Sequence, residues 1–484
     1  MSTRDAAIAM RRLGLGAKPG DLKRIAADPR GYVAAQLSKA ASALLDDPDL
    51  EPSHVVFTEA QRAQMQQKAA RDAEKAASQP MVKMADAKEQ PTQTTPPTFA
   101  PPSPNPPPAP PGQKANAVRR DALLDEISSR VDRAITTETP LLERLVYFWS
   151  NHFCVSAGKG AVRGLAGGYE REAIRPHVLG RFGDMLKATA QHPAMLIYLD
   201  NQISIGPSSK AGINRKRGLN ENLAREILEL HTLGVNGGYT QADVMAFAAI
   251  LTGWSVGNLN QPETLPGRFF YAPNRHEPGA QTVLGKSYPD EGQRTGEAVL
   301  AALAVHPATA KHLATKLARH FIADAPPPSA VERLAAVFTK TGGDLGAVTR
   351  ELIALPEVWS TPPKKIVPPF DFVVSIVRGF GPRPKSGELA RLAAALGQPT
   401  WMVPSPKGWP DDDDAWMGPA PVRERLRIAE MLARQMDKLT DPRGLADDIL
   451  GEALSPETRQ AISRAESREQ GFELLVMAPE FLRR

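Results

Sequence analysis

Apolar residues recur at helical spacing along most of the chain. After Thr240, the residues Val244, Phe247 and Leu251 keep a period of 3.6 residues. Asp243 stands three positions after Thr240, the spacing of a capping box, so a helix is predicted to begin there. Similar runs predict helices at about 1–12, 140–153, 169–190, 219–233, 293–304, 307–322, 328–340, 367–379, 386–396, 420–438 and 458–477.

One region departs from this pattern. Residues 268–271 and 281–284 are rich in aromatic and β-branched side chains, and they flank the polar segment 274–279. This arrangement predicts that the two runs pair as a small hairpin. No repeat of fixed period is present, which argues against a solenoid. The predicted fold class is therefore mainly α: a multi-helix single globular unit with one small β-hairpin and a disordered Pro-rich insertion.

The insertion is defined by its composition. Residues 91–111 hold 11 prolines in 21 positions, which predicts an extended, disordered spacer because proline lacks a backbone donor. Residues 57–78 have few large apolar side chains and predict a solvated helix leading into it. We therefore divide the chain into N-terminal helices at 1–49, an insertion at 50–114 and the main helical part at 115–484. The first segment has too few apolar residues for its own core and is expected to pack on the region after 115.

Composition and charge exclude several classes of protein. The 484 residues are 42% hydrophobic, and 59 basic against 54 acidic residues give a net charge of +5, so nucleic-acid binding is not expected. No apolar run is long enough to span a membrane. Cys154 is the single cysteine, which fits a reducing compartment. Glycines and charges follow Arg11 and Arg12 where an export signal needs an apolar stretch, so a cytoplasmic location is expected, and a periplasmic one stays open.

A histidine near the end of the helix at 140–153 is a first candidate for chemistry. His152 shares its helical face with Leu141, Leu145 and Phe148, so it is expected on the buried side. One interpretation is a core histidine bonded to a carbonyl group. The other is a ligand or a general base.

The helix at 219–233 carries the charged candidates. Glu221, Arg225 and Glu229 form a stripe at a spacing of four residues, which is usually a structural ion-pair ladder. Glu226 falls at the margin of the apolar face, where a carboxylate needs a partner or its pKa rises. Glu226 is therefore the best single candidate for acid–base or ligand work. Pairing with a buried arginine is the alternative.

Other signals are weaker. His276 lies in the predicted hairpin loop, where it could face a cleft. The four aspartates at 411–414 could attract a divalent cation, but a solvated turn fits their spacing better. No serine-hydrolase elbow, phosphate-binding loop or dinucleotide fingerprint is present in the sequence, which disfavours enzymes of those common folds.

Several segments together resemble the domain of unknown function 1800 family. They are Phe-Trp-Ser-Asn-His-Phe at 148–153, the segments 192–201, 220–234, 238–244 and 251–254, Lys-Gly-Trp at 407–409 with Trp416, and Arg-Leu-Gly-Leu-Gly at 12–16. His276-Glu277 stands where the family commonly has His-Asp. The resemblance implies a bacterial, mostly helical protein with no established reaction or cofactor. It also implies a partner that resembles the sulfatase and alkaline phosphatase superfamily.

Two hypotheses follow. The first is an enzyme with a His/Glu-lined cleft that performs acid–base or metal-assisted hydrolytic chemistry. Its catalytic candidates are Glu226, His152, Glu221 and Arg225, and a divalent metal would be held by His152, Glu226 and His276. The second is a non-catalytic accessory or binding protein that acts with the sulfatase/phosphatase-like partner. Convergence of the candidate side chains at a solvent-reachable pocket would favour the first hypothesis.

Overall fold

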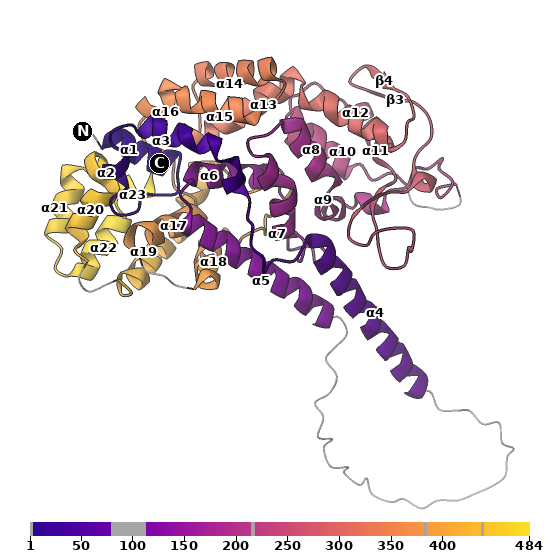
Figure 1. Ribbon diagram of the computed structural model, residues 1–484, viewed down its shortest axis with the longest axis horizontal. Helices are drawn as coiled ribbons and strands as arrows, with labels where there is room; N and C mark the ends of the chain where they lie inside the picture. Colours follow the sequence, from indigo (N-terminus) through magenta and orange to yellow (C-terminus); the bar gives the residue numbers. More distant parts are fainter. Residues whose placement is uncertain (1–2, 79–112, 214–217, 382–384, 437–439) are drawn as a thin grey trace, which may run out of the picture.

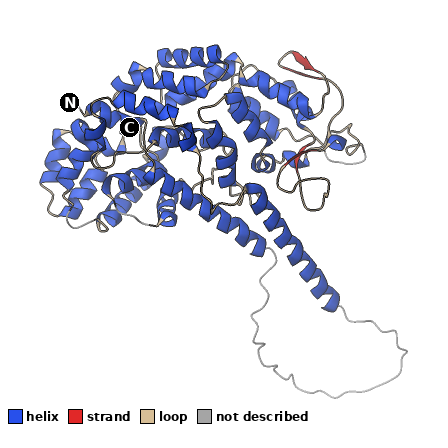
Figure 2. Cartoon of the chain, viewed as in Figure 1, coloured by secondary structure: helices blue, strands red, loops and turns tan. Residues whose placement is uncertain are grey.

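The fold is mainly α-helical, as predicted. We analysed a computed structural model of the chain, which describes residues 3–78, 113–213, 218–381, 385–436 and 440–484. Helices account for 63% of the structure, and Figure 2 shows how few strands accompany them. The disordered spacer expected at 91–111 lies outside the described residues. The solvated helix predicted before it is present as α4 (Ser53–Ser78).

Most helices begin within a few residues of their predicted start. Proline at the first helical position opens many of them, where its missing N–H is not needed. The helices are α1 (Arg4–Arg12), α2 (Asp21–Ile25), α3 (Pro29–Ala35), α4, α5 (Gln113–Thr136), α6 (Pro140–His152), α7 (Ala166–Tyr169), α8 (Phe182–Gln191), α9 (Pro193–Tyr198), α10 (Asn222–Glu226), α11 (Gln241–Leu251), α12 (Gln293–Ala304), α13 (Pro307–Phe321), α14 (Pro328–Thr341), α15 (Leu345–Ala354), α16 (Pro356–Ser360), α17 (Pro369–Phe380), α18 (Ser386–Ala395), α19 (Pro419–Ala433), α20 (Pro442–Leu450), α21 (Pro456–Ser463), α22 (Arg468–Val476) and α23 (Pro479–Leu482).

Three predicted helices have different internal structure. The helix expected at 169–190 is divided into α7, the π-helical turn η3 (Glu170–Ile174), the 3-10 turn η4 (Arg175–His177) and α8. The helix expected at 219–233 begins only at Asn222, because the Asn220 side chain instead bonds the carbonyl groups of Leu199 and Asp200. It then changes into one turn of π-helix, η6 (Ile227–Thr232). The helix expected at 458–477 is split into α21 and α22, with Ser467 capping the start of the second.

The residues of β2 and β3 were predicted as strands, those of β1 and β4 were not, and the predicted pairing was wrong. β2 (Phe269–Tyr271) pairs antiparallel with β1 (Trp254–Val256), and β3 (Gln281–Val283) pairs with β4 (Lys286–Tyr288). The hairpin is the second pair, since Leu284 and Gly285 both have positive φ, as a tight two-residue turn requires. Residues 274–279 do not form the expected turn between β2 and β3.

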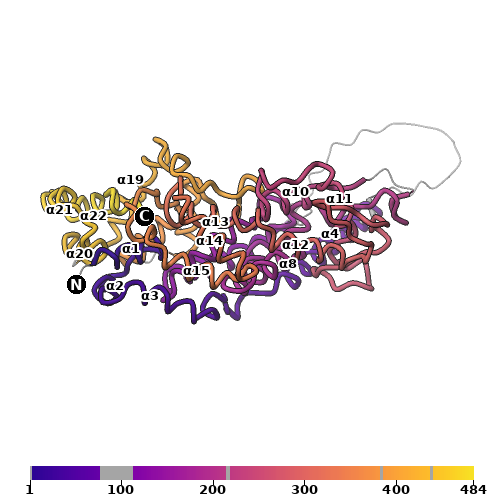
Figure 3. Tube along the Cα trace, turned by 90° about the horizontal axis from the view of Figure 1, so that it is seen from above, coloured from indigo at the N-terminus to yellow at the C-terminus, as the bar shows by residue number. Residues whose placement is uncertain are grey.

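Segments far apart in the sequence lie side by side. The N-terminal helices α1 and α2 pack against α16 and α20, and Arg11 donates to the carbonyl groups of Phe481 and Arg483, so the two chain ends are close (Figures 1 and 3). Helices α8, α10, α11 and α12 and the strands gather at the opposite end (Figure 1). Helices α4 and α5 pack together and project from the body as an arm (Figure 1).

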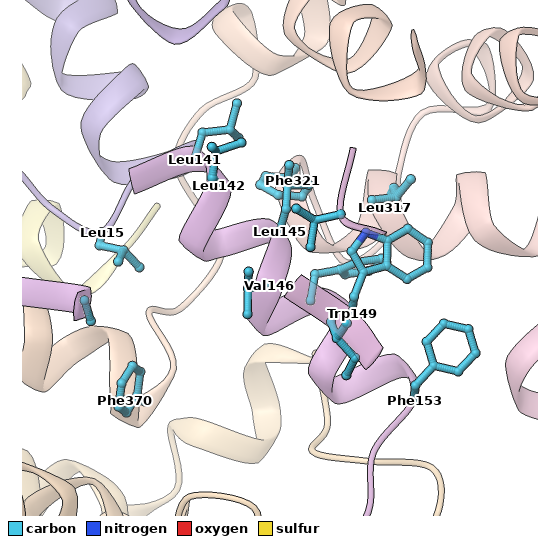
Figure 4. Close-up of a cluster of buried hydrophobic side chains, with 14 of the residues drawn as sticks. Leu15, Leu141, Leu142, Leu145, Val146, Trp149, Phe153, Leu317, Phe321 and Phe370 are labelled. Carbon is cyan, nitrogen blue, oxygen red and sulfur yellow. The ribbon is translucent and has the colours of Figure 1, made fainter. Parts of the chain in front are cut away.

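The core is continuous and surrounds α6. Leu141, Leu145 and Trp149 of this helix are almost fully buried, and Leu317 and Phe321 of α13 lie against them (Figure 4). Burial of apolar side chains of this size stabilises a fold by about 1.5–3 kcal/mol each. In the described ranges, no helix is both long and apolar enough to cross a lipid bilayer. The core therefore fixes α6 and α13 against each other, and these two helices carry the site.

Candidate functional site

A cleft of about 470 Å³ lies between four parts of the chain. Its main walls are α6, the middle of η6, helix α13 and the segment 398–412, and the lining is completed by Arg130 of α5 and by Pro368, Phe370 and Asp371 at the start of α17. A cavity of this size is in the range of small-molecule binding sites. Since the four parts are distant in sequence, the cleft exists only in the folded protein.

Two stripes of side chains line opposite walls of the cleft. Each stripe has a spacing of four residues: Arg144, Phe148 and His152 on α6, and His312, Lys316 and His320 on α13. The two stripes run antiparallel, because Lys316 meets His152 while His320 meets Arg144 and Phe148. Eight residues of helix span about 12 Å, so the cleft has two distinct ends.

His152 is buried and holds two elements together. Its Nε2 donates to the carbonyl oxygen of His231 at 3.1 Å, and its Nδ1 accepts from Lys316 Nζ at 2.9 Å. Burial first, and then the nearby Lys316, keep the pKa of His152 well below its usual value. The imidazole is therefore neutral with its proton on Nε2, and the prediction that His152 lies on the buried face is confirmed.

The π-helical turn explains where these histidines bind. Leu230 and His231 lie in its last turn, where carbonyl groups lack a partner within the helix. His312 Nε2 donates to the Leu230 carbonyl oxygen at 3.1 Å, as His152 does to that of His231. Burial lowers the pKa of His231 to about 3 and that of His312 to about 4, with Lys316 as the next cause. Three neutral imidazoles thus surround one lysine.

Lys316 is the cationic centre of this end of the cleft. Burial is the main cause that lowers the pKa of Lys316 to about 8; Arg319 and Lys407 contribute to this shift, and Cys154 and Asp411 oppose it. Among the described residues, neither Lys316 nor Lys407 forms an ion pair with a carboxylate. Arg319 donates only to the Asp324 carbonyl oxygen. Three basic side chains therefore face the cleft without a carboxylate partner that the structure describes.

Glu229 is the acidic residue in the wall of the same end. It accepts a hydrogen bond from Tyr239 Oη at 3.0 Å, and it lies near Arg225. The Glu229 carboxylate therefore interacts with Arg225 of α10 and with Tyr239, and it does not neutralise the basic side chains of α13.

The opposite end is electrostatically balanced. Arg144 Nη1 lies 2.7 Å from Asp371 Oδ2, and His320 Nδ1 lies 3.2 Å from Asp411 Oδ2. Arg484 also bonds Asp371, and Lys365 bonds the Asp411 carbonyl oxygen. Of the aspartates at 411–414, the half-buried Asp411 therefore takes part in this network of ion pairs. Since each charge already has a partner, this end is structural in character.

The loop 407–409 is held in place by Asn151. The Asn151 side chain accepts from the Trp409 amide at 2.7 Å and donates to the Trp409 carbonyl oxygen at 2.9 Å. Gly408 has φ +83°, and a Cβ there would lie 2.6 Å from the Asn151 carbonyl oxygen. Adjacent residues of α6 thus bind opposite walls: Asn151 holds the loop, and His152 holds η6.

The charged candidates of the 219–233 segment lie outside the cleft lining, with Glu229 as the exception. Glu221 Oε1 pairs with Arg225 Nη2 at 2.8 Å, as the ladder spacing indicates, and both are half-exposed. Glu226 is half-buried, and it has no hydrogen bond or ion pair with another described residue. Burial, followed by Glu229, raises its pKa, and Glu226 in turn contributes to raising the pKa of the Cys154 thiol in the cleft wall.

His276 lies apart from this cleft. Its Nε2 is 3.1 Å from Asp290 Oδ1, and its Nδ1 is 3.0 Å from the Thr252 carbonyl oxygen. These contacts tie the 276–279 segment to the start of β1. No group of three or more His, Cys, Asp or Glu side chains in the described ranges is placed to hold a metal ion. The structure therefore places His152 in the cleft, and it brings neither Glu226 nor His276 to it.

A buried serine and a buried histidine also lie beside the more exposed Glu172 at the start of α4. Ser53 Oγ donates to Glu172 at 2.7 Å, and His192 Nε2 lies 3.1 Å from the same carboxylate. His192 Nδ1 already accepts the Ala194 amide as the N-cap of α9. The serine is therefore bonded to the acid and not activated by the histidine, so this group is a structural anchor.

The fold and the site define a class: a mainly helical protein with a deep cleft that is basic at one end and balanced at the other. The family described as "Protein of unknown function (DUF1800)" matches residues 8–483, and the chain belongs to this family. No curated protein and no solved structure matches it significantly. The motifs at 148–153, 220–234 and 407–409 all contribute to the same cleft.

Proposed function

We propose that the protein is an enzyme that binds an organic anion at the basic end of the cleft and performs hydrolytic acid–base chemistry there. The observation that carries the proposal is Lys316, a partly buried amine in the cleft wall without a described carboxylate partner. Arg319 and Lys407 are exposed at the cleft and would hold the anionic group, because cations without a carboxylate partner attract anions.

In this mechanism Lys316 transfers the proton and His152 positions it. The neutral amine of Lys316 donates one hydrogen to His152 Nδ1, and this hydrogen bond directs the lone pair of the amine toward the cleft. The amine takes a proton from the attacking water, and the resulting ammonium returns that proton to the leaving group. A pKa of about 8 leaves a useful fraction of neutral amine near neutral pH.

A turnover screen with matched variants tests the proposal. The substrates are 4-nitrophenyl phosphate, 4-nitrophenyl sulfate and 4-nitrophenyl esters of dicarboxylic acids. We expect hydrolysis of at least one, a rate that rises with pH to a plateau above about 8, and a loss of at least about 100-fold in Lys316→Met. Lys311→Met, on an exposed position of the same helix, is the control. Equal rates in Lys316→Met and wild type would exclude the mechanism.

The metal-assisted form of the hypothesis rests on His152, Glu226 and His276. It stays a prediction, and metal analysis of the purified protein with Glu226→Gln as the comparison tests it. Bound divalent metal that disappears in this variant would favour that form.

A second candidate function is the accessory role with a sulfatase/phosphatase-like partner. The observation that favours it is the α4–α5 arm, since the α4 side chains from Arg62 to Ala76 are mostly exposed and polar. Co-purification with such a partner, lost when residues 62–120 are replaced by a short linker, would support this role.

A further inference from the structure

The cleft contains more than a basic end, and its other features describe the rest of the ligand. Trp409 is half-buried in the cleft wall, and Phe148 lines the cleft from α6. Trp416 supports the Trp409 ring from behind, with ring centroids 6.3 Å apart. An aromatic ring at the edge of a binding cleft presents a flat apolar face to a ligand.

The position of Trp409 is fixed before any ligand binds. Asn151 bonds both its amide and its carbonyl group, and Gly408 packs directly against Asn151. Trp416 Nε1 donates to the Pro410 carbonyl oxygen at 3.2 Å, which fixes the supporting ring as well. A rigid aromatic platform loses little conformational entropy on binding, so its contact area converts into affinity efficiently.

The neighbours of this platform set the charge of the ligand. Lys407 lies two residues before Trp409, is exposed, and lies close enough to Lys316 to lower its pKa. The flat face and the uncompensated basic charges therefore belong to one continuous region of the cleft.

Two buried hydroxyl groups in the cleft wall are a third feature that bears on the ligand. Tyr147 Oη and Thr400 Oγ1 are buried and have no hydrogen-bond partner among the described residues, although both residues line the cleft. Tyr147 lies one helical turn before Asn151 in α6, and its ring contacts Phe370, which also lines the cleft. A buried hydroxyl without a partner costs about 1–3 kcal/mol, and a polar ring substituent of the ligand would remove that cost.

We infer that the ligand of this cleft is an aromatic organic anion. Its carboxylate, sulfate or phosphate group binds Arg319 and Lys407, its ring stacks on Trp409, and a polar ring substituent reaches Tyr147 and Thr400. This inference rests on the proposed anion-binding function and specifies its substrate class.

Calorimetric titration with matched ligand pairs tests the inference. The pairs are phenyl phosphate with methyl phosphate, and benzoate with acetate, so each pair keeps the anion and changes only the ring. We expect the aromatic member of at least one pair to bind the wild-type protein at least about tenfold more tightly than its aliphatic partner. Trp409→Leu should reduce that ratio to about two or less, and Trp409→Phe should retain most of it.

Two further variants separate this inference from the proposed function. Lys407→Met should weaken the binding of both members of a pair by the same factor, because it removes a contact with the anion. Tyr147→Phe should leave the affinity for phenyl phosphate unchanged and lower the affinity for 4-hydroxyphenyl phosphate. Equal affinities within both pairs, an unchanged ratio in Trp409→Leu, or no binding of either pair at millimolar concentration would overturn the aromatic assignment. Undiminished anion binding in Lys407→Met would instead overturn the proposed anion site.

Discussion

Asn151 and His152 show how two adjacent side chains shape the cleft. Both lie at the end of α6, and they bind the 407–409 loop and the η6 turn respectively. The Phe-Trp-x-Asn-His-Phe motif thus has a physical role in this chain: its polar members fix two walls, while Trp149 and Phe153 are buried in the core.

Gly408→Ala should reduce stability more than an ordinary glycine substitution. The positive φ alone costs about 1 kcal/mol, and contact of the new Cβ with Asn151 adds to it, for a total of about 1–3 kcal/mol. Gly397→Ala is the matched control, because Gly397 has φ +94° and a Cβ there meets nothing within 4 Å. Chemical denaturation of both variants measures the difference. Equal losses would mean that the contact with Asn151 is unimportant.

Glu226→Gln should leave the protein as stable as wild type or slightly more stable. The carboxylate has a raised pKa and no described partner, so its charge opposes folding at neutral pH and no described cation is left unpaired by its removal. Glu170→Gln is the contrast: Glu170 is buried with Arg130 and Arg175, and its loss should cost about 3–5 kcal/mol. Thermal melting of the two variants tests this difference. A strong loss in Glu226→Gln would reveal a structural partner.

At the scale of elements, helix existence could be predicted and the cleft could not. The spacing of apolar residues predicts α11, α12, α13 and α14 closely, and His306 caps α13 as its His-Pro sequence indicates. The π-turn at 227–232 could not be predicted, because a one-residue change of register leaves the apolar pattern almost unaltered.

The role of Lys316, at the centre of the site, could also hardly be predicted from the sequence. Lys316 is one of many lysines, and its character arises from three imidazoles that belong to α6, η6 and α13. The i, i+4, i+8 row of His312, Lys316 and His320 was the signal that could have identified this face. In contrast, the importance of the 148–153 segment could be recognised from the sequence.

The three histidines around Lys316 predict how the stability of the protein changes at acid pH. Burial keeps the pKa values of His152, His231 and His312 below that of a free histidine, so the unfolded chain binds more protons than the folded protein below about pH 6.5. Stability should therefore fall as pH decreases from about 6.5 to 4, by up to about 1.4 kcal/mol per pH unit for each group. His312→Gln keeps a donor for the Leu230 carbonyl group and should make this decline shallower. An unchanged slope in thermal melts would contradict the assignment.

The lowered pKa of Lys316 predicts how the stability of the protein changes at alkaline pH. Its pKa is about 8 in the folded protein and is higher when the chain unfolds, so between these values the unfolded chain again binds more protons. The melting temperature of wild type should consequently rise from pH 8 to 10 relative to Lys316→Met. The variant should also be at least as stable as wild type at pH 7, because it removes a partly buried charge. Parallel profiles of the two proteins would show that the amine is not shifted.

For the whole molecule, the contacts of the first helices indicate how the parts associate. Helices α1 and α2 pack against α16 and α20, α3 packs against α15, and α4 packs along α5. A protease cut in the segment between α4 and α5 should therefore give two fragments that stay together on a sizing column in native buffer. Their separation without denaturant would contradict this packing. Mass spectrometry of the eluted peak identifies the cut site.

The assembly of the cleft from four distant segments has a practical consequence. An unfolded or partly unfolded chain cannot present Lys316, His152, Trp409 and Glu229 together, so any ligand binds the native state alone. Such a ligand raises the unfolding temperature in proportion to the logarithm of its concentration. A thermal-shift library of small anions is thus a direct route to the natural ligand, because it needs no assumption about the reaction.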